Sequence, residues 1–169
     1  TSFNAAIVST HEKKLSIFQN NIRGLNDYNF FCDWKITLST IPTPPDIIIL
    51  SEVKLKPTTQ TSLYNIDGYE LVHCLREADF CKGGLLVYIN NAITFSVVEN
   101  SSTTFEKIVI EMSFNRKLFH LICMYRPPIQ QNFSHFIDSL EQSFEKCPSY
   151  VILAGDINVD KSLISSESK

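Results

Sequence analysis

The sequence predicts a layered sandwich of the α/β or α+β class. Two helical segments and eight strand segments are spread along the chain, without an internal repeat or a low-complexity linker. Residues 47–50 form the unbroken apolar run IIIL, which is typical of a strand covered on both faces. With 169 residues and 44% hydrophobic composition, the chain has enough apolar side chains for a sizeable core.

The first third of the chain predicts a strand, a helix and a second strand. Residues 15–21 alternate between apolar and polar side chains, as a strand does, and a turn follows them. Asn26 or Asp27 can cap a helix that continues to about residue 38. Three prolines between residues 42 and 45 exclude regular helix before the strand at residues 46–50.

The rest of the chain predicts a run of strands, one helix and a last strand. Apolar and β-branched segments separated by turn residues predict strands at residues 69–75, 85–89, 93–98, 107–112 and 118–125. Apolar residues at helical spacing then predict an amphipathic helix over residues 132–147. The run VILAGDINVD at residues 151–160 is an apolar strand that leads an acid and an amide into a turn.

Polar side chains stand where predicted strands end. Asn21 closes the first strand, Glu52 follows the apolar run, and Tyr125 ends the strand before a proline pair. Asp156 and Asn158 follow the last strand, two residues apart, and face the same side if the extended geometry continues. Loops at strand ends are where a rigid scaffold holds catalytic groups.

Glu52 and Asp156 suit a hard divalent cation. Mg²⁺ takes one or two carboxylates together with phosphate and water oxygens, so these residues predict a Mg²⁺ or Mn²⁺ site. Taken singly, Glu52 fits an ordinary surface acid, and Asp156 with Asn158 fits a helix cap or an Asx turn. Tyr125 alone fits a core aromatic whose hydroxyl reaches the rim.

Five motifs occur in an order that resembles the endonuclease/exonuclease/phosphatase superfamily, in particular the apurinic-type endonuclease domains of non-LTR retrotransposons. The resemblance covers about residues 15–160, and the glycine pair and the YRPP motif favour the retrotransposon branch over the DNA-repair and lipid-phosphatase branches. Asn20 in place of Asn21 stays an alternative for the first motif. The motifs are NNIRGL at 20–25, LSEVK at 50–54, KGGLLVY at 82–88, YRPP at 125–128 and GDINVD at 155–160.

The resemblance implies a DNase I-like α/β/β/α sandwich and a role for each strand-end residue. Glu52 and Asn21 match the residues of the family's metal site, Glu52 as the metal-binding glutamate and Asn21 as the asparagine that orients the metal-side carboxylate and the phosphate. Asp156 matches the aspartate that orients or activates the attacking water. Asn158 matches the amide that holds the scissile phosphate, and Tyr125 the tyrosine beside it.

The resemblance also implies DNA as the substrate and a reverse transcriptase domain downstream in a parent polyprotein. Arg23, Arg126 and Lys82 are the candidate DNA contacts. His73 and Arg76 flank the same predicted hairpin as Lys82, and for these flanking residues a solvated strand face is the favoured interpretation over DNA contact.

The chain departs from the family pattern after the last motif. Family members continue to a C-terminal Asp-His pair, whereas all four histidines here precede Asp156. We therefore expect a partial domain at residues 15–160, a poorly ordered segment at 1–14 and a polar tail at 161–169. The second sheet should be incomplete and leave an apolar face or an unpaired strand edge exposed.

Two hypotheses of different classes follow, with a third beside them. The first is a Mg²⁺-dependent endonuclease domain that nicks DNA. The second is a catalytically incomplete fragment or relic of that domain, because the Asp-His segment is absent. The third is a phosphatase of the same superfamily, which shares the metal chemistry.

Composition limits the remaining classes. A net charge of −3 argues against a nucleic-acid binder with an overall basic surface, but a local basic patch stays open. Five cysteines without a C-x-x-C pair argue against zinc and against a disulfide framework, and favour an intracellular setting, with a nuclear location consistent with a DNA substrate. No apolar stretch approaches the length of a membrane span.

Overall fold

The computed structural model describes residues 14–25, 27–76, 83–102, 105–128, 133–147 and 150–158. Lys82, residues 1–13 of the predicted N-terminal segment and the predicted tail at 161–169 lie outside them. Within the described residues the chain forms eight strands, two α-helices and one short 3₁₀ helix, in the order predicted for the strands and α-helices. They are β1 (Ile17–Asn21), α1 (Tyr28–Ser39), β2 (Ile47–Ser51), η1 (Thr61–Tyr64), β3 (Tyr69–Cys74), β4 (Leu85–Asn90), β5 (Thr94–Ser101), β6 (Glu106–Phe114), β7 (Lys117–Tyr125), α2 (Phe133–Glu145) and β8 (Tyr150–Asp156).

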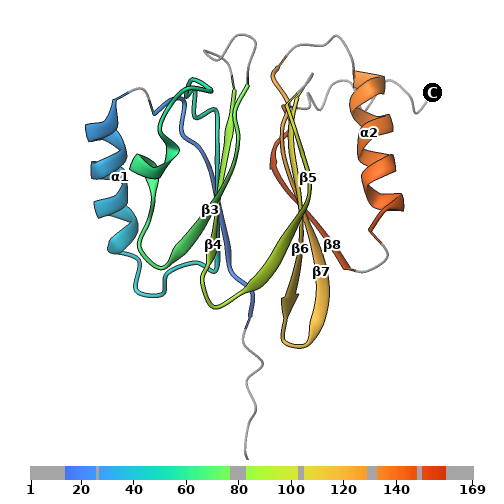
Figure 1. Cartoon of the computed structure of the whole chain (residues 1–169), viewed down its shortest axis with the longest axis horizontal. Helices are drawn as coiled ribbons and strands as arrows, with labels where there is room; N and C mark the ends of the chain where they lie inside the picture. Colours follow the sequence, from blue (N-terminus) through green and yellow to red (C-terminus); the bar gives the residue numbers. More distant parts are fainter. Residues whose placement is uncertain are drawn as a thin grey trace, which may run out of the picture.

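The strands form two four-stranded sheets that face each other, with one helix outside each (Figure 1). The first sheet has the order β1-β2-β4-β3 and the second β5-β6-β7-β8. β1 pairs with β2 in parallel, β7 pairs with β8 in parallel, and the other neighbours are antiparallel. The predicted α/β/β/α sandwich is therefore confirmed.

Apolar side chains fill three layers between these elements. Every residue of β2 is buried, as its continuous apolar run predicts, and successive residues point to opposite faces. Ile47 and Ile49 join the core between the sheets, whereas Ile48 and Leu50 pack under α1. A separate layer under α2 contains Phe136, with residues of β6 and β7.

Most boundaries differ from the prediction by one or two residues, and the larger differences have local causes. Asp27 is the N-cap of α1, because its side chain accepts a hydrogen bond from the Asn29 backbone N–H at 2.9 Å. β5 continues to Ser101 because a bulge between Val97 and Glu99 breaks its alternation without ending the strand. The 3₁₀ helix was not predicted.

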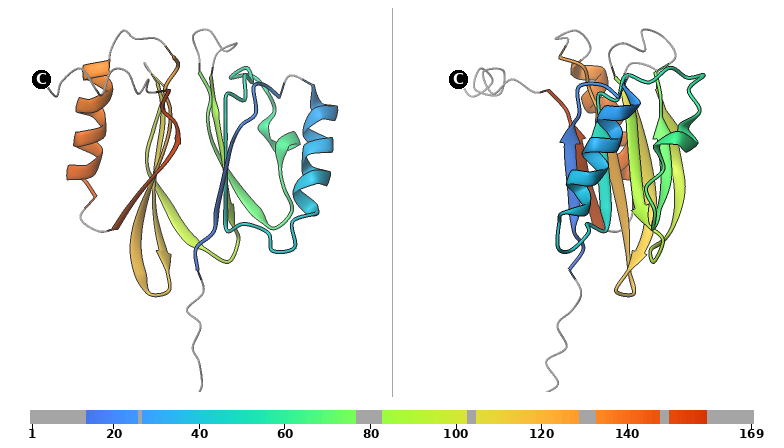
Figure 2. Two further views of the ribbon diagram at one scale, coloured as in Figure 1. Left: turned by 180° about the vertical axis from the view of Figure 1, so that it is seen from behind. Right: turned by 90° about the vertical axis from the view of Figure 1, so that its left-hand side faces the viewer.

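β1 and β8 lie side by side at the same side of the sandwich (Figure 2). In the described part of the chain each pairs with one neighbouring strand, so each forms the edge of its sheet. β8 exposes 63% of Tyr150 and 38% of Leu153. An apolar strand edge of this kind is what the sequence predicts for an incomplete second sheet.

Of the helices in the described residues, none is long and apolar enough to cross a membrane. α1 has 12 residues and α2 has 13, and both pack against a sheet.

Replacing Gly155 by alanine should destabilise the fold. Gly155 has φ 135° and pairs with Met124, and a Cβ there would lie 1.9 Å from the Met124 carbonyl oxygen. Because backbone must move, we expect a loss of about 2–4 kcal/mol in the free energy of unfolding, measured by urea denaturation. Gly68→Ala is the matched control, since Gly68 has φ 84° but open space around its Cα. Equal losses in the two variants would contradict the steric account.

Candidate active site

The Asn21 side chain links the two sheets at the edge where β1, β2, β7 and β8 end. Its Nδ2 donates to Glu52 Oε1 at 3.0 Å and to Asp156 Oδ2 at 2.7 Å. Its Oδ1 accepts the Arg23 backbone N–H at 3.1 Å, so the amide is held with its donor toward both carboxylates. Asn21, and not Asn20, makes these bonds.

Glu52 is the centre of this network. Besides Asn21, Glu52 Oε1 accepts the Tyr125 hydroxyl at 3.1 Å, and Oε2 lies 3.7 Å from Lys54 Nζ. The Glu52 side chain is 19% exposed, so the carboxylate reaches the surface of the sandwich. Its backbone has φ 54°, in the left-handed region that a non-glycine residue enters only when its surroundings hold it there.

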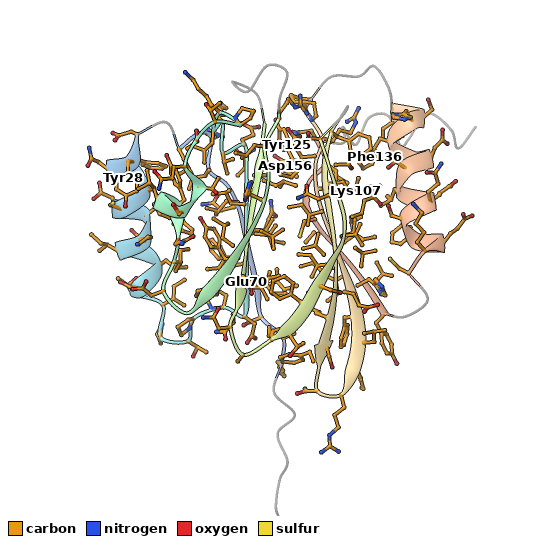
Figure 3. The ribbon with its side chains drawn as sticks, in the orientation of Figure 1. Tyr28, Glu70, Lys107, Tyr125, Phe136 and Asp156 are labelled. Carbon is orange, nitrogen blue, oxygen red and sulfur yellow. The ribbon has the colours of Figure 1, made fainter. Side chains whose placement is uncertain are left out.

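Tyr125 and Asp156 are direct neighbours, because the β7–β8 ladder pairs the last residues of the two strands. Both lie at one end of the sandwich, between the sheets (Figure 3). Burial, and then the negative charge of Glu52, raise the pKa of Tyr125. The hydroxyl therefore stays protonated and acts as a donor to Glu52.

Asp156 and Asn158 form a tight turn after β8. Asp156 Oδ1 accepts the Asn158 backbone N–H at 3.3 Å, so the Asx turn considered from the sequence is present beside the site contact. Asn158 has φ 44°, and its Nδ2 donates to the Arg126 carbonyl oxygen at 2.8 Å. The Asn158 amide thus lies at the rim of the network, and its binding of a phosphate stays a prediction.

The three candidate DNA contacts differ in position. Arg23 is exposed just after β1, next to Asn21. Arg126 is only 6% exposed, and its guanidinium donates to the carbonyl oxygens of Ile157 and Asn158. It also lies over the rings of Phe133 and Phe136 at 5.3 and 5.8 Å from their centroids. This position favours a role in holding the loop after β8 over contact with DNA. Lys82 lies outside the described residues.

The donor atoms fit a magnesium-type site. Glu52 and Asp156 each place one carboxylate oxygen within 3.0 Å of the same Asn21 nitrogen, although they come from different sheets. No group of three or more His, Cys, Asp or Glu residues suited to a metal occurs in the described ranges. Two carboxylates with room for substrate and water oxygens are what Mg²⁺ uses, whereas a zinc site needs a fuller set of protein ligands.

The histidines of the described ranges lie away from these contacts. His120 is buried and its Nε2 lies 3.4 Å from Glu111 Oε2. His135 is on α2 beside the ring of Phe105. His73 lies in β3 near Asn100, whose amide donates to its carbonyl oxygen.

A buried ion pair beside the site was not predicted. The guanidinium of Arg76 forms a two-fold contact with Glu106, with Nε to Oε1 at 2.8 Å and Nη2 to Oε2 at 2.9 Å. The Arg76 side chain is 12% exposed and that of Glu106 is 0% exposed, so the predicted solvated position of Arg76 is wrong. Burial raises the pKa of Glu106, and the Arg76 guanidinium opposes that rise. The sequence signal that could have indicated this pair was Glu106, an acid at the start of an apolar strand.

Comparison with known proteins identifies the fold. No family model and no curated protein matches the chain. Its solved structural neighbours include D. rerio TDP2 complexed with a single-strand DNA product, at a TM-score of 0.62 and 17% identity, covering 89% of this chain and 63% of that one. The endonuclease domain of TRAS1, a telomere-specific non-LTR retrotransposon, matches with a TM-score of 0.59 and 12% identity, covering 88% and 61%. A Bacteroides thetaiotaomicron endonuclease/exonuclease/phosphatase family protein matches with a TM-score of 0.60 and 14% identity, covering 88% and 65%.

The chain has the endonuclease/exonuclease/phosphatase fold. The resemblance carried by the five sequence motifs is thereby confirmed at the level of the fold. On this endonuclease/exonuclease/phosphatase fold, the chain brings Asn21, Glu52, Tyr125 and Asp156 into one hydrogen-bonded network. Each of the four comes from the end of a different strand or the residue that follows it.

Proposed function

We propose that the chain hydrolyses phosphodiester bonds in DNA with Mg²⁺ or Mn²⁺, as the nicking endonuclease domain of a retrotransposon-like protein. The observation that carries this proposal is the Asn21 amide, which holds Glu52 and Asp156 together across the two sheets. Sharing the fold with a retrotransposon endonuclease domain and with a TDP2 that binds a DNA product supports DNA as the substrate.

The residues divide the work by chemistry. Glu52 and Asp156 would hold the ion, which when bound stabilises charge on the phosphoryl oxygens and the leaving group. Asn21 turns a donor, not an oxygen, toward the carboxylates, so it fits an orienting role better than that of a ligand. Tyr125 fixes Glu52 by donating to Oε1.

Asp156 would orient or deprotonate the attacking water. One of its carboxylate oxygens is held by Asn21 Nδ2 and the other by the Asn158 N–H, so the carboxylate plane is set by its own turn and by the opposite sheet. Asn158 would hold the scissile phosphate when its amide leaves the Arg126 carbonyl oxygen for the substrate. Arg23, exposed beside Asn21, is the accessible one of the two candidate DNA contacts that lie in the described residues.

The retrotransposon assignment rests on the motifs and on the TRAS1 neighbour. Gly83 and Gly84 have φ 150° and 93°, and a Cβ on either would clash with Glu106 or with Val53. The glycine pair of the motif is therefore required by close packing beside the site. A downstream reverse transcriptase domain and a nuclear location belong to this proposal.

A second candidate is a domain that binds DNA without cutting it. The described site contains no histidine, and the described histidines lie in β3, β7 and α2. Without a histidine that donates to the scissile phosphate, the network would bind an ion and a phosphate but would not complete hydrolysis.

A panel of substrates tests the proposal. The chain is incubated with Mg²⁺ and, separately, supercoiled plasmid, single-stranded DNA and a sugar phosphate. The proposal expects nicked circles from the plasmid and no release of phosphate from the sugar phosphate. Phosphate release without nicking would instead support the phosphatase alternative.

Tyr125→Phe should slow nicking by about tenfold. The substitution removes a donor to a charged group, which is worth about 1.5 kcal/mol or slightly more, and one decade of rate corresponds to about 1.4 kcal/mol. Tyr69→Phe is the matched control, because it also removes a hydroxyl that donates a hydrogen bond, here to the Pro45 carbonyl oxygen at the other end of the sandwich. A Tyr125→Phe rate equal to that of the control would show that the hydroxyl does not support Glu52.

A further inference from the structure

Glu106 connects the second sheet to a glycine turn of the first sheet. It is the first residue of β6, is fully buried, and its Oε1 accepts the Gly84 backbone N–H at 3.0 Å. The same carboxylate accepts two hydrogen bonds from the guanidinium of Arg76, which lies just after β3. Three donors from the first sheet therefore converge on one carboxylate of the second.

Gly83 and Gly84 also hold the segment that carries Glu52. The Gly83 carbonyl oxygen accepts the Lys54 N–H at 2.7 Å, and the Gly84 carbonyl oxygen accepts the Val53 N–H at 3.3 Å. Glu52 and Lys54 both have positive φ, 54° and 55°. Two left-handed non-glycine residues in one short segment need such bonds from outside, because the conformation is costly on its own.

Packing makes this connection tight. A Cβ on Gly83 would lie 2.3 Å from Glu106 Oε1, and a Cβ on Gly84 would lie 2.6 Å from Val53 Cγ2. The Glu106 carboxylate, the two glycines and the Val53 side chain beside Glu52 are therefore in close contact. A shift of the ion pair has a direct path to the Glu52 segment through these contacts.

Glu106 also lies next to the other support of Glu52. The β6–β7 ladder pairs Glu106 with Tyr125, whose hydroxyl donates to Glu52 Oε1. The ion pair is thus connected to the Glu52 carboxylate by two routes, through Gly83 and Gly84 and through the end of β7.

We propose that Arg76 and Glu106 are positioning residues, which set the place of the Glu52 carboxylate for a divalent cation through the Gly83–Gly84 turn. The inference rests on the proposed function, since it assigns Glu52 to the ion. Neither residue touches the ion or the substrate in this account. Their effect is on how well the site is formed before the ion arrives.

The test measures Mn²⁺ binding to the whole chain in wild type, Glu106→Gln and Arg76→Lys. The electron spin resonance signal of free Mn²⁺ reports how much of the ion stays unbound. Glu106→Gln keeps the shape but presents an amide donor to the arginine fork. Arg76→Lys keeps the charge but loses the two-fold geometry. We expect the dissociation constant for Mn²⁺ to rise by about 10–100-fold in both variants, as for other residues that support a metal ligand.

Lys107→Met is the matched control. Lys107 is the next residue of β6 and is also buried in an ion pair, 2.7 Å from Glu99, but its amine donates to Ser139 and Ser143 of α2. Its loss should lower the melting temperature as the test variants do, without changing the Mn²⁺ dissociation constant. A purely structural role of Arg76 and Glu106 would make all three variants alike.

Each outcome has one meaning. A dissociation constant within twofold of wild type in folded Glu106→Gln overturns the inference, and if that variant does not fold, the same result in Arg76→Lys does so. Mn²⁺ binding by wild type without nicking contradicts the proposed function and leaves the inference standing. No Mn²⁺ binding by folded wild type contradicts both.

Discussion

Glu52→Ala should reduce Mg²⁺-dependent nicking by about 10³-fold. The ion supplies several kcal/mol of charge stabilisation at the phosphoryl group, and about 4 kcal/mol corresponds to three decades of rate. The substitution also removes the acceptor shared by Asn21 Nδ2 and the Tyr125 hydroxyl, so the rest of the network loses its order. The measurement is the rate of conversion of supercoiled to nicked plasmid at saturating enzyme.

The control for this variant is Glu70→Ala. Glu70 is an exposed acid in β3, and it lies away from the end of the sandwich that carries Tyr125 and Asp156 (Figure 3). The Glu70→Ala substitution removes the same charge and should leave the nicking rate unchanged. If Glu52→Ala nicks at the wild-type rate, Glu52 does not hold the ion, and the assignment of the site fails.

Asp156→Asn should slow nicking by about 10²–10⁴-fold, the range for loss of a positioned general base. Asparagine keeps the size of the side chain, and its oxygen can still accept from Asn21 Nδ2, so the network should persist. What is lost is the charge of a carboxylate that takes a proton from water and holds the ion together with Glu52. Single-turnover rates of plasmid nicking measure this step apart from DNA binding.

Asp67→Asn makes the same change at an exposed turn before β3 and should leave the rate unchanged. DNA affinity, measured by fluorescence anisotropy of a labelled duplex, should be unchanged or slightly higher in Asp156→Asn. A large loss of affinity with little loss of rate would contradict the catalytic role and make Asp156 a binding residue.

The sandwich was predictable because its signals are local. The apolar run of β2 predicts a strand buried on both faces, and the structure buries each of its residues. The polar residues at strand ends were also visible, since each ends or follows a predicted strand, and the parallel pairs β1–β2 and β7–β8 bring them to one edge. Asn21 could be singled out over Asn20 only through a family motif, and the bonds of its amide show the reason for the choice.

The parts that the sequence did not predict depend on contacts between the sheets. Arg76 seemed solvated, because nothing in the local pattern indicates that Glu106, thirty residues later, lies opposite its fork. Arg126 follows a motif tyrosine and suggested a DNA contact, but the rings of α2 and the loop after β8 enclose it. Such contacts form when the layers pack together. They join residues far apart in the sequence, so no local sequence pattern predicts them.

The most direct test of the account is whether the folded chain nicks supercoiled plasmid only when a divalent cation is present. The account predicts nicked circles with Mg²⁺, none after chelation with EDTA, and recovery when Mg²⁺ is restored in excess. Nicking that persists in EDTA, or no nicking at any Mg²⁺ concentration by a chain that circular dichroism shows to be folded, would contradict it.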